Sequence, residues 1–191
     1  RDDADIAIEY ARKAIKRDRK NSEYHMTLAL GYATRLMRGG FSSMFYVGKF
    51  KQECEEAVKL DPTNVGAHMA LVQYYARAPG LMGGGMDRAR ETAATVTELD
   101  PFLGHIADAV IAEVEEDLAA AESSYTAAAL VDTTDPEGWG GLGMFLMRTG
   151  RYEQAIPVGK RVARLAPEAA DAPYQIGKAY LMIGEELDES E

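Results

Sequence analysis

The side chains best suited to acid–base or metal chemistry are three histidines, His25, His68 and His105. Imidazole is a common metal ligand, and each ring falls near the start of an expected helix, shortly before a Leu or Val. Stacked helices would hold such rings about 10 Å apart, too far to share one ion with bonds of about 2 Å. We therefore expect the histidines to pack between helices, and we predict no metal site.

Catalysis has few other candidates in this chain. Neither a Gly-x-Ser-x-Gly elbow nor a His-Glu-x-x-His motif occurs, although a Ser-His-Asp set can arise from any chain order. The single cysteine, Cys54, lies in a helical segment with no base beside it, so we expect a buried thiol. We predict no catalytic residue and no cofactor. A hydrolase or transferase remains the alternative, and it would need a His bonded to a nucleophile.

A glycine-rich turn precedes one of the expected helices. Free N–H groups at a helix start could hold an anion, which makes Gly83, Gly84 and Gly85 a candidate binding turn. A nucleotide loop would also need a preceding strand and a Gly-Lys-Ser/Thr sequence, and Asp87 is expected to cap the helix instead. We favour a structural turn that uses positive φ angles.

Acidic side chains gather between two expected helices, and they are Glu113, Glu115, Glu116, Asp117 and Glu122. A charge run of this kind is usually a solvated helix face. A weak divalent-ion site is the alternative interpretation.

The composition limits the class of partner. The 191 residues are 47% hydrophobic and carry a net charge of −10, which argues against nucleic acid because phosphate binding needs a basic surface. No apolar run approaches the roughly 18–20 residues of a membrane span. The chain begins at Arg1, within or just before a helix, so we expect a segment upstream of it.

Prolines at 62, 101, 136 and 167 recur at intervals of 39, 35 and 31 residues. Proline cannot continue a helix, so it is common just after a helix end. The expected helices cover 3–20, 22–37, 42–60, 64–77, 87–99, 103–115, 117–131, 137–148, 152–165 and 170–183. Ser42 or Ser43 is the expected cap of the third, and Pro157 predicts a kink or a later start in the ninth.

One stretch has a bulky aromatic, a Leu-Gly pair on the next turn, a glycine turn, a small alanine and a closing proline. These residues are Trp139, Leu142, Gly143, Gly150, Tyr152, Ala155, Leu165 and Pro167. The spacing resembles the tetratricopeptide repeat (TPR) family, whose unit is a helix-turn-helix of about 34 residues. The resemblance covers nearly the whole chain. It implies an all-α, right-handed superhelix (α-solenoid) of stacked TPR helix-turn-helix pairs, acting as a non-enzymatic scaffold that binds proteins or peptides.

On this resemblance residues 1–191 form a single solenoid. Its expected units are 1–20 (a second helix only), 22–62, 63–101, 102–136, 137–167, 170–184 (a first helix only) and an acidic tail at 185–191. The Ala78-Pro79-Gly80 turn with its three following glycines also resembles a group of bacterial, often exported, TPR proteins. That narrower resemblance favours the bacterial periplasm over the cytoplasm.

The first helices of successive TPR units line a concave groove, where the family binds its partners. The residues expected to face it are Met26, Leu30, Met69, Gln73, Ile106, Val110, Met144, Met147, Arg148, Tyr174 and Lys178. Methionine is flexible and suits varied apolar partners, so we predict that a protein or peptide segment docks there. A shift of one residue in register would instead place some of these methionines in the core.

Two alternatives stay open. The solenoid could enclose a pocket for a small hydrophobic ligand, or it could assemble with itself. Residues 12–20 are basic and residues 185–191 are acidic, so the chain ends could attract head to tail. The other interpretation is that the late cations of the first helix simply complement its dipole.

Overall fold

The computed structural model describes residues 3–37, 39, 44–168 and 171–188, and all regular structure in these residues is helical. The first helices are α1 (Asp3–Arg17), α2 (Ser22–Met37), α3 (Met44–Leu60), α4 (Val65–Arg77), a short 3-10 helix η1 (Gly80–Met82) and α5 (Met86–Leu99). They are followed by α6 (Pro101–Val114), α7 (Leu118–Val131), α8 (Pro136–Arg148), α9 (Tyr152–Leu165) and α10 (Asp171–Asp188). The predicted all-α class is confirmed, and each predicted helix corresponds to an observed one.

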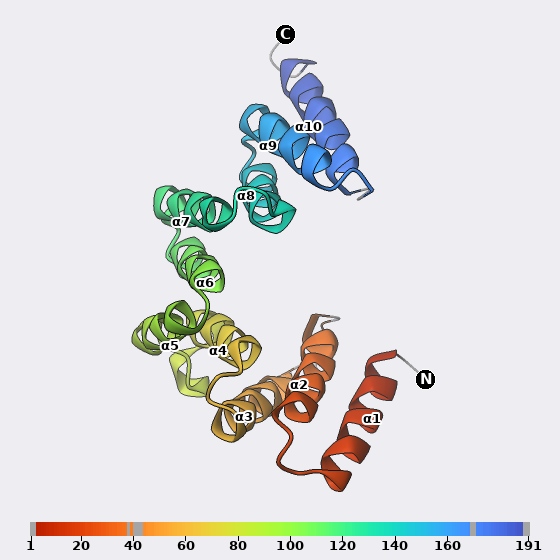
Figure 1. Ribbon diagram of the computed structural model, residues 1–191, viewed down its shortest axis with the longest axis vertical. Coiled ribbons are helices and arrows are strands. Elements are labelled where there is room, and N and C mark those ends of the chain that lie inside the picture. Colours follow the sequence, from red (N-terminus) through yellow and green to blue (C-terminus); the bar gives the residue numbers. More distant parts are fainter. Residues whose placement is uncertain (1–2, 38, 40–43, 169–170, 189–191) are drawn as a thin grey trace. The chain divides into compact units, whose positions relative to one another are not determined.

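The chain divides into two compact units, Arg1–Asp100 and Pro101–Glu191, and each is described by itself. Within each unit every helix packs against the next one along the chain, and α10 also touches α8 (Figure 1). Short turns make neighbours antiparallel, so each helix buries an apolar stripe against both of them. No helix in the described ranges is long and apolar enough to cross a membrane.

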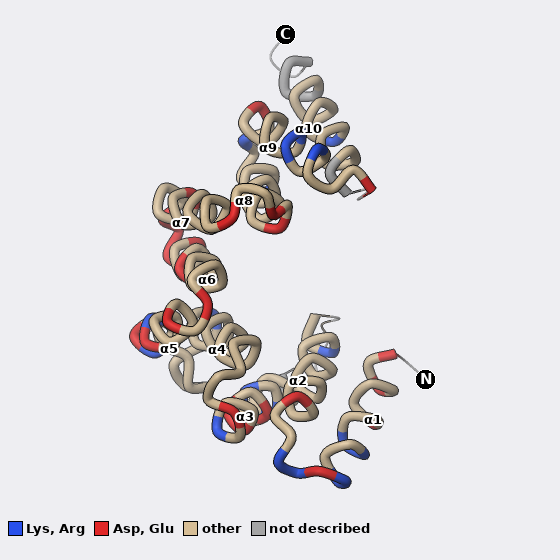
Figure 2. The backbone as a smooth tube through the Cα atoms, viewed as in Figure 1, with Lys and Arg blue, Asp and Glu red and all other residues tan. Residues whose placement is uncertain are grey.

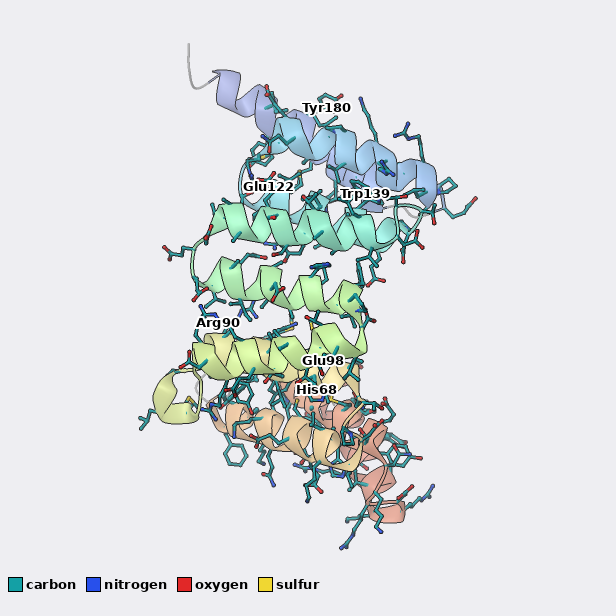
Figure 3. The ribbon with its side chains drawn as sticks, turned by 60° about the vertical axis from the view of Figure 1, so that its left-hand side comes forward. His68, Arg90, Glu98, Glu122, Trp139 and Tyr180 are labelled. Carbon is teal, nitrogen blue, oxygen red and sulfur yellow. The ribbon has the colours of Figure 1, made fainter. Side chains whose placement is uncertain are left out.

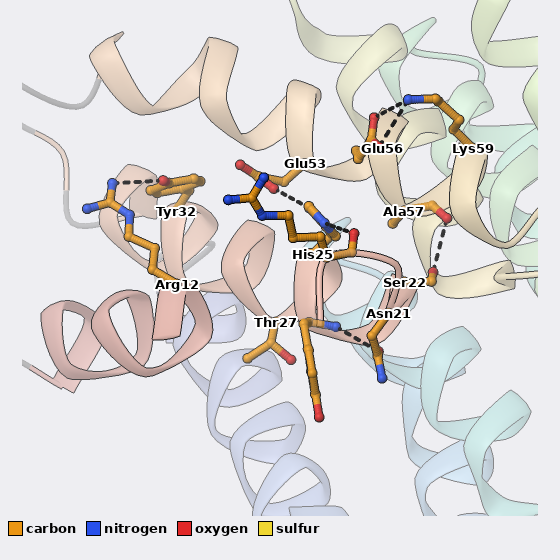
Figure 4. A network of polar contacts seen from close by, with 12 residues as sticks. Arg12, Asn21, Ser22, His25, Thr27, Tyr32, Glu53, Glu56, Ala57 and Lys59 are labelled. Carbon is orange, nitrogen blue, oxygen red and sulfur yellow. Dashed lines mark hydrogen bonds and ion pairs between the residues drawn. The ribbon is translucent and has the colours of Figure 1, made fainter. Parts of the chain in front are cut away.

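Small side chains and buried polar bonds hold unit 1 together. Cys54 and Ala57 of α3 are fully buried. At the base of α2, the Ser22 hydroxyl donates to the backbone carbonyl of Ala57 at 3.0 Å and accepts from the Asn64 amide at 2.8 Å (Figure 4). Asn64 in turn caps α4 by accepting from the N–H of Ala67 at 2.9 Å. Three successive helices are therefore tied by one chain of hydrogen bonds.

The thiol of Cys54 matches its predicted buried role. Burial, and then the nearby charges of Glu53 and Glu55, raise its pKa to about 12. A protonated, enclosed thiol is a poor nucleophile, so Cys54 acts as a small packing residue.

The core of unit 2 is centred on Phe145. Phe145 is fully buried and packs against Tyr125, with ring centroids 5.2 Å apart. Leu142 and Leu146 lie beside it, and small residues such as Ala121 let the helices approach closely. Aromatic pairs at this separation stabilise a core beyond the area that they bury.

The turns before α4 and α8 are held by the same pair of hydrogen bonds between an aspartate and a threonine. Asp61 accepts from both the N–H and the hydroxyl of Thr63, at 2.9 and 2.7 Å, and Asp132 does so with Thr134 at 2.8 and 2.6 Å. These bonds to the threonine lower the pKa of each carboxyl. The Asp-x-Thr sequence thus forms an Asx turn that leads the chain into the next helix.

Three local predictions need correction. Asp87 lies in the first turn of α5 and makes no capping bond, because the helix begins at Met86 with Gly85 at the cap position. Helix α9 starts at Tyr152 and continues through Pro157, so the later start was wrong. Helix α10 extends to Asp188, into the segment expected to be a tail. The predicted serine cap of the third helix lies outside the described residues.

Candidate binding site

Three aromatic nitrogens occupy equivalent positions in their helices. Nε2 of His25, Nε2 of His68 and Nε1 of Trp139 each lie near the carbonyl oxygen six residues earlier, at 3.4, 2.9 and 3.2 Å. The two histidines are buried, and the guanidinium of Arg161 lies 4.0 Å above the Trp139 ring; Figure 3 labels His68 and Trp139. The predicted packing role of these two histidines is confirmed, while His105 is half-buried.

Metal chemistry finds no support in the described part of the chain. No three His, Cys, Asp or Glu side chains there lie close enough together to hold an ion. His25 instead places Nδ1 2.7 Å from the carboxylate of Glu53, which ties α2 to α3 (Figure 4).

The glycine turn satisfies its own N–H groups. Those of Gly83, Gly84 and Gly85 donate to carbonyl oxygens within or beside the turn at 2.9, 3.1 and 2.8 Å. Gly83 has a φ of 87°, and a Cβ on Gly84 would lie 1.7 Å from the carbonyl oxygen of Ala78. Gly83 and Gly84 are therefore glycine for reasons of shape, and none of the three N–H groups is free to bind an anion.

The acidic cluster divides among separate structural roles. Asp117 caps α7, accepting from the backbone N–H three residues on at 3.0 Å. Glu122 ion-pairs with Arg151 at 2.6 Å, and Glu113 accepts from Arg148 at 2.6 and 3.1 Å. These carboxylates point to different helices, which does not suit a shared cation.

Arg148, expected in the groove, is held by a polar network. Its guanidinium also donates to the Tyr125 hydroxyl at 3.2 Å, and that hydroxyl donates to Glu113 at 2.5 Å. Burial and the bond to Glu113 raise the pKa of Tyr125. For Arg148 burial lowers the pKa, but the bond and charge of Glu113 outweigh it and raise the pKa overall. The network joins α6, α7 and α8, so Arg148 serves the packing of unit 2.

The groove residues predicted in unit 1 are divided between core and surface. Met26 is only 8% exposed and belongs to the core. Met69 is half-buried, whereas Leu30, at 59%, and Gln73 are exposed. Met26 therefore has no surface to offer a partner, because its side chain is already enclosed.

The groove residues predicted in unit 2 are divided in the same way. Val110 is buried, and Ile106 packs against the core around Phe145. On α10, Tyr174 and Lys178 are exposed. Met144 and Met147 of the predicted set line a cavity in this unit.

That cavity lies between α8, α9 and α10 and has a volume of about 560 Å³. Its wall is largely apolar, and Glu137 is the one ionisable group among its lining residues. The lining residues are Pro136, Glu137, Gly140, Gly143, Met144 and Met147 of α8, Ala155, Gly159, Val162 and Ala166 of α9 and its end, and Gln175 and Ile176 of α10.

Glycines on the helix faces create this space. A Cβ on Gly140 would meet nothing within 4 Å, and one on Gly143 would touch Val158 at 3.4 Å. Gly159 lets Ile176 approach, because a Cβ there would lie 2.8 Å from that side chain. Without a side chain at Gly140, the cavity stays open between the helices. An apolar hollow flanked by flexible methionines suits the binding of apolar groups.

Sequence reasoning missed Gly140, Gly159 and Ile176. The signal was present, since Gly140 and Gly143 lie one turn apart on the face that carries Met144 and Met147. On α10 the predicted register was one or two residues away, with Tyr174 and Lys178 named in place of Gln175 and Ile176.

Comparison with known proteins places this region in a family. Residues 136–168, which span α8, α9 and the turn that follows, match the family model of the tetratricopeptide repeat. A thermophilic TPR protein of Thermus thermophilus is similar over 93% of this chain and 91% of its own, with 18% identity and a TM-score of 0.72. The chain has the TPR fold.

Two further solved structures resemble this chain in fold. PilF of Pseudomonas aeruginosa is 18% identical over 89% of this chain and 72% of its own, with a TM-score of 0.56. MamA is 17% identical over 88% and 92%, with a TM-score of 0.50. No curated protein matches the sequence. TPR folds in general are non-enzymatic scaffolds that bind proteins or peptides on the surfaces that stacked repeats create.

Proposed function

We propose that this protein is a non-enzymatic TPR scaffold that binds an apolar segment of another protein in the cavity between α8, α9 and α10. The observation that carries the proposal is the largely apolar wall of that cavity, whose α8 and α9 sides belong to the repeat that matches the family model. An exposed, preformed apolar hollow of this size is a typical recognition feature.

Recognition would centre on one or two bulky apolar side chains of the partner. Burying such an anchor stabilises a complex by about 1.5–3 kcal/mol, so a single anchor supports only weak binding. Met144, which is 59% exposed, and Met147 can change rotamer around the anchor. We expect the selected segments to be rich in Leu, Ile, Phe or Met at helical spacing, because an amphipathic helix presents such anchors on one face.

A substitution that fills the cavity tests this proposal. Gly140→Leu places a side chain in open space, so it should block the cavity without a clash. Gly177→Leu is the matched control, because Gly177 is also helical, also has nothing within 4 Å of its Cβ position and does not line the cavity. Binders would be selected from a random peptide library displayed on phage against the unmodified protein.

The selected peptides should share bulky apolar residues and should bind Gly140→Leu at least about tenfold more weakly. Their affinity for Gly177→Leu should stay within about twofold. Peptides without an apolar consensus, or with equal affinity for both variants, would show that the cavity is not the recognition site.

A small apolar ligand is the second candidate occupant, and the volume of the cavity favours it. Sites for small molecules typically measure about 300–1,000 Å³. Native mass spectrometry of the purified protein would then show an added mass that is lost in Gly140→Leu and retained in Gly177→Leu. A protein without added mass that binds the selected peptides would support the first candidate over this one.

A further inference from the structure

Unit 1 of this acidic chain contains a strong local positive charge. The chain carries a net charge of −10, yet residues 12–20 hold six Lys and Arg against one acid. Figure 2 shows these blue residues at the end of α1 and in the turn to α2. Helix dipoles favour cations in the last turn, but Arg12 and Lys13 precede that turn and face a pocket.

The pocket lies between α1 and α3 and has a volume of about 680 Å³. Its acids are already paired, since Glu9 bonds Lys13 at 2.7 Å and Asp5 bonds Arg35. The other cations that line it are Arg12, Lys16 and Lys49, and none of them ion-pairs with a carboxylate of the described residues. Their charges are therefore available to an incoming anion.

Aromatic side chains hold two of these cations, Lys49 and Arg12, in place. The Nζ of Lys49 lies 3.8 Å from the centroid of Phe45, and Arg12 donates to the Tyr32 hydroxyl at 3.0 Å (Figure 4). Phe45 is 65% exposed and contacts Tyr46 edge-on, with ring centroids 5.7 Å apart. The pocket thus offers fixed positive charge beside an apolar ring, a combination that suits carboxylates next to an aliphatic side chain.

We propose that this pocket binds the acidic segment 185–191 of a second copy of the chain. The segment reads Glu-Glu-Leu-Asp-Glu-Ser-Glu, with five acids, no base and one apolar residue, Leu187. Its charge complements Arg12, Lys16 and Lys49, and Leu187 complements Phe45. Each copy of the chain carries one pocket and one segment, so each copy can donate a segment and accept one.

A contact of this kind is heterologous, so it extends copy by copy unless a ring closes. Its energy comes mainly from exposed charges, which salt screens over about 8–10 Å at physiological strength. We therefore expect association that grows with protein concentration and weakens strongly as salt is raised.

Two variants and one control isolate the contact. Lys49→Glu reverses a charge in the pocket, and Lys59→Glu makes the same change further along α3, outside the pocket. Glu186→Lys with Glu189→Lys reverses the segment. Far-UV circular dichroism checks folding, and Lys16→Glu replaces the pocket variant if that one is unfolded.

Sedimentation velocity at about 20 mM salt, where charges are weakly screened, should show the unmodified protein associating. The pocket variant and the segment variant should each associate at least about tenfold more weakly, and Lys59→Glu within about twofold of the unmodified protein. A mixture of the two variants should form a one-to-one dimer and stop there, because only one intact pocket and one intact segment remain to meet.

A chain that stays monomeric at low salt would overturn the proposal, whatever other acidic peptide the pocket binds. Equal effects of Lys49→Glu and Lys59→Glu would overturn it as well, since the loss would then follow net charge alone. Variants that remain monomers when mixed would contradict the pairing of pocket and segment.

Discussion

Unit 1 and unit 2 are built from the same kind of antiparallel helix pairs, yet the polar bonds between their helices differ in how deeply they are buried. In unit 1 the bonds between Ser22, Asn64 and the carbonyl of Ala57 run through buried side chains, and His25 reaches Glu53 on the next helix. In unit 2 the buried core around Phe145 consists mainly of apolar side chains, and the bonds of Arg148 to Glu113 on another helix are more exposed. Buried hydrogen bonds specify which groups meet, whereas apolar packing accepts any shape that fills the space.

The same difference appears on the surfaces. Unit 1 has a pocket lined by cations and aromatic rings, such as Lys49 above Phe45. Unit 2 has an apolar cavity that exists because Gly140 carries no side chain. A repeat scaffold can thus offer two unrelated chemistries without changing its backbone design, because the size and charge of a few surface positions decide what each unit can bind.

The largest expected effect is a difference in stability between substituting a phenylalanine of the core and substituting one at the surface. Phe145→Ala in unit 2 should lower the free energy of unfolding by about 3–5 kcal/mol, because it empties a fully enclosed site. Phe45→Ala in unit 1 should change it by less than about 0.5 kcal/mol, since the ring is largely exposed. Urea denaturation followed by circular dichroism measures both. A large loss from Phe45→Ala would mean that this ring supports the fold instead of a binding pocket.

The next effect concerns the turn of unit 1. Gly84→Ala should destabilise the protein by about 2 kcal/mol or more, because the new Cβ would lie 1.7 Å from a backbone oxygen that cannot move away cheaply. Gly80→Ala in the same turn has nothing within 4 Å and should cost less than about 0.5 kcal/mol. Thermal unfolding of the two variants makes the comparison. Similar midpoint temperatures for the two variants would show that the turn is loosely packed around Gly84.

Most of the fold could be predicted from the sequence, and the reasons are local. The closing prolines at 136 and 167 mark helix ends through the geometry of proline alone, and α9 begins at Tyr152 as predicted. The end of α10 was missed, because acidic residues late in a helix oppose its dipole and suggested fraying. Asp87 was assigned as a cap because a capping residue type stood near a helix start, although Gly85 occupies the position.

The candidate site was harder to predict, because a groove depends on register. A helix turns by 100° per residue, so an error of one position exchanges surface for core. Met26 lies in the core for this reason, while Met144 is at the surface. The cavity itself depends on residues that lack side chains, and a list of chemically active groups passes over Gly140.

Alkaline pH should probe the buried thiol of unit 1. Below about pH 9 both the folded and the unfolded thiol are protonated; above it the unfolded thiol ionises while Cys54, with a pKa of about 12, keeps its proton. The unfolded state then binds fewer protons, so stability falls by about 1.4 kcal/mol per pH unit up to that folded pKa. Urea unfolding of the unmodified protein and Cys54→Ala between pH 8 and pH 10.5 isolates this contribution. If the free energies of unfolding of the two proteins changed in parallel with pH, the thiol would be in contact with solvent.

The smallest expected effect compares the stability change when a glycine of each unit is replaced by alanine. Gly140→Ala in unit 2 should stabilise the protein by about 0.5–1 kcal/mol, since alanine restricts the unfolded chain and its methyl group enters open space. Gly31→Ala in unit 1 carries the same helical benefit but places the Cβ 2.7 Å from the side chain of Ile8, so it should gain less or destabilise. Calorimetric midpoints of the two variants measure the difference. If Gly140→Ala were the destabilising one, α8 would be packed at that face, and the cavity would be too narrow to take an apolar anchor.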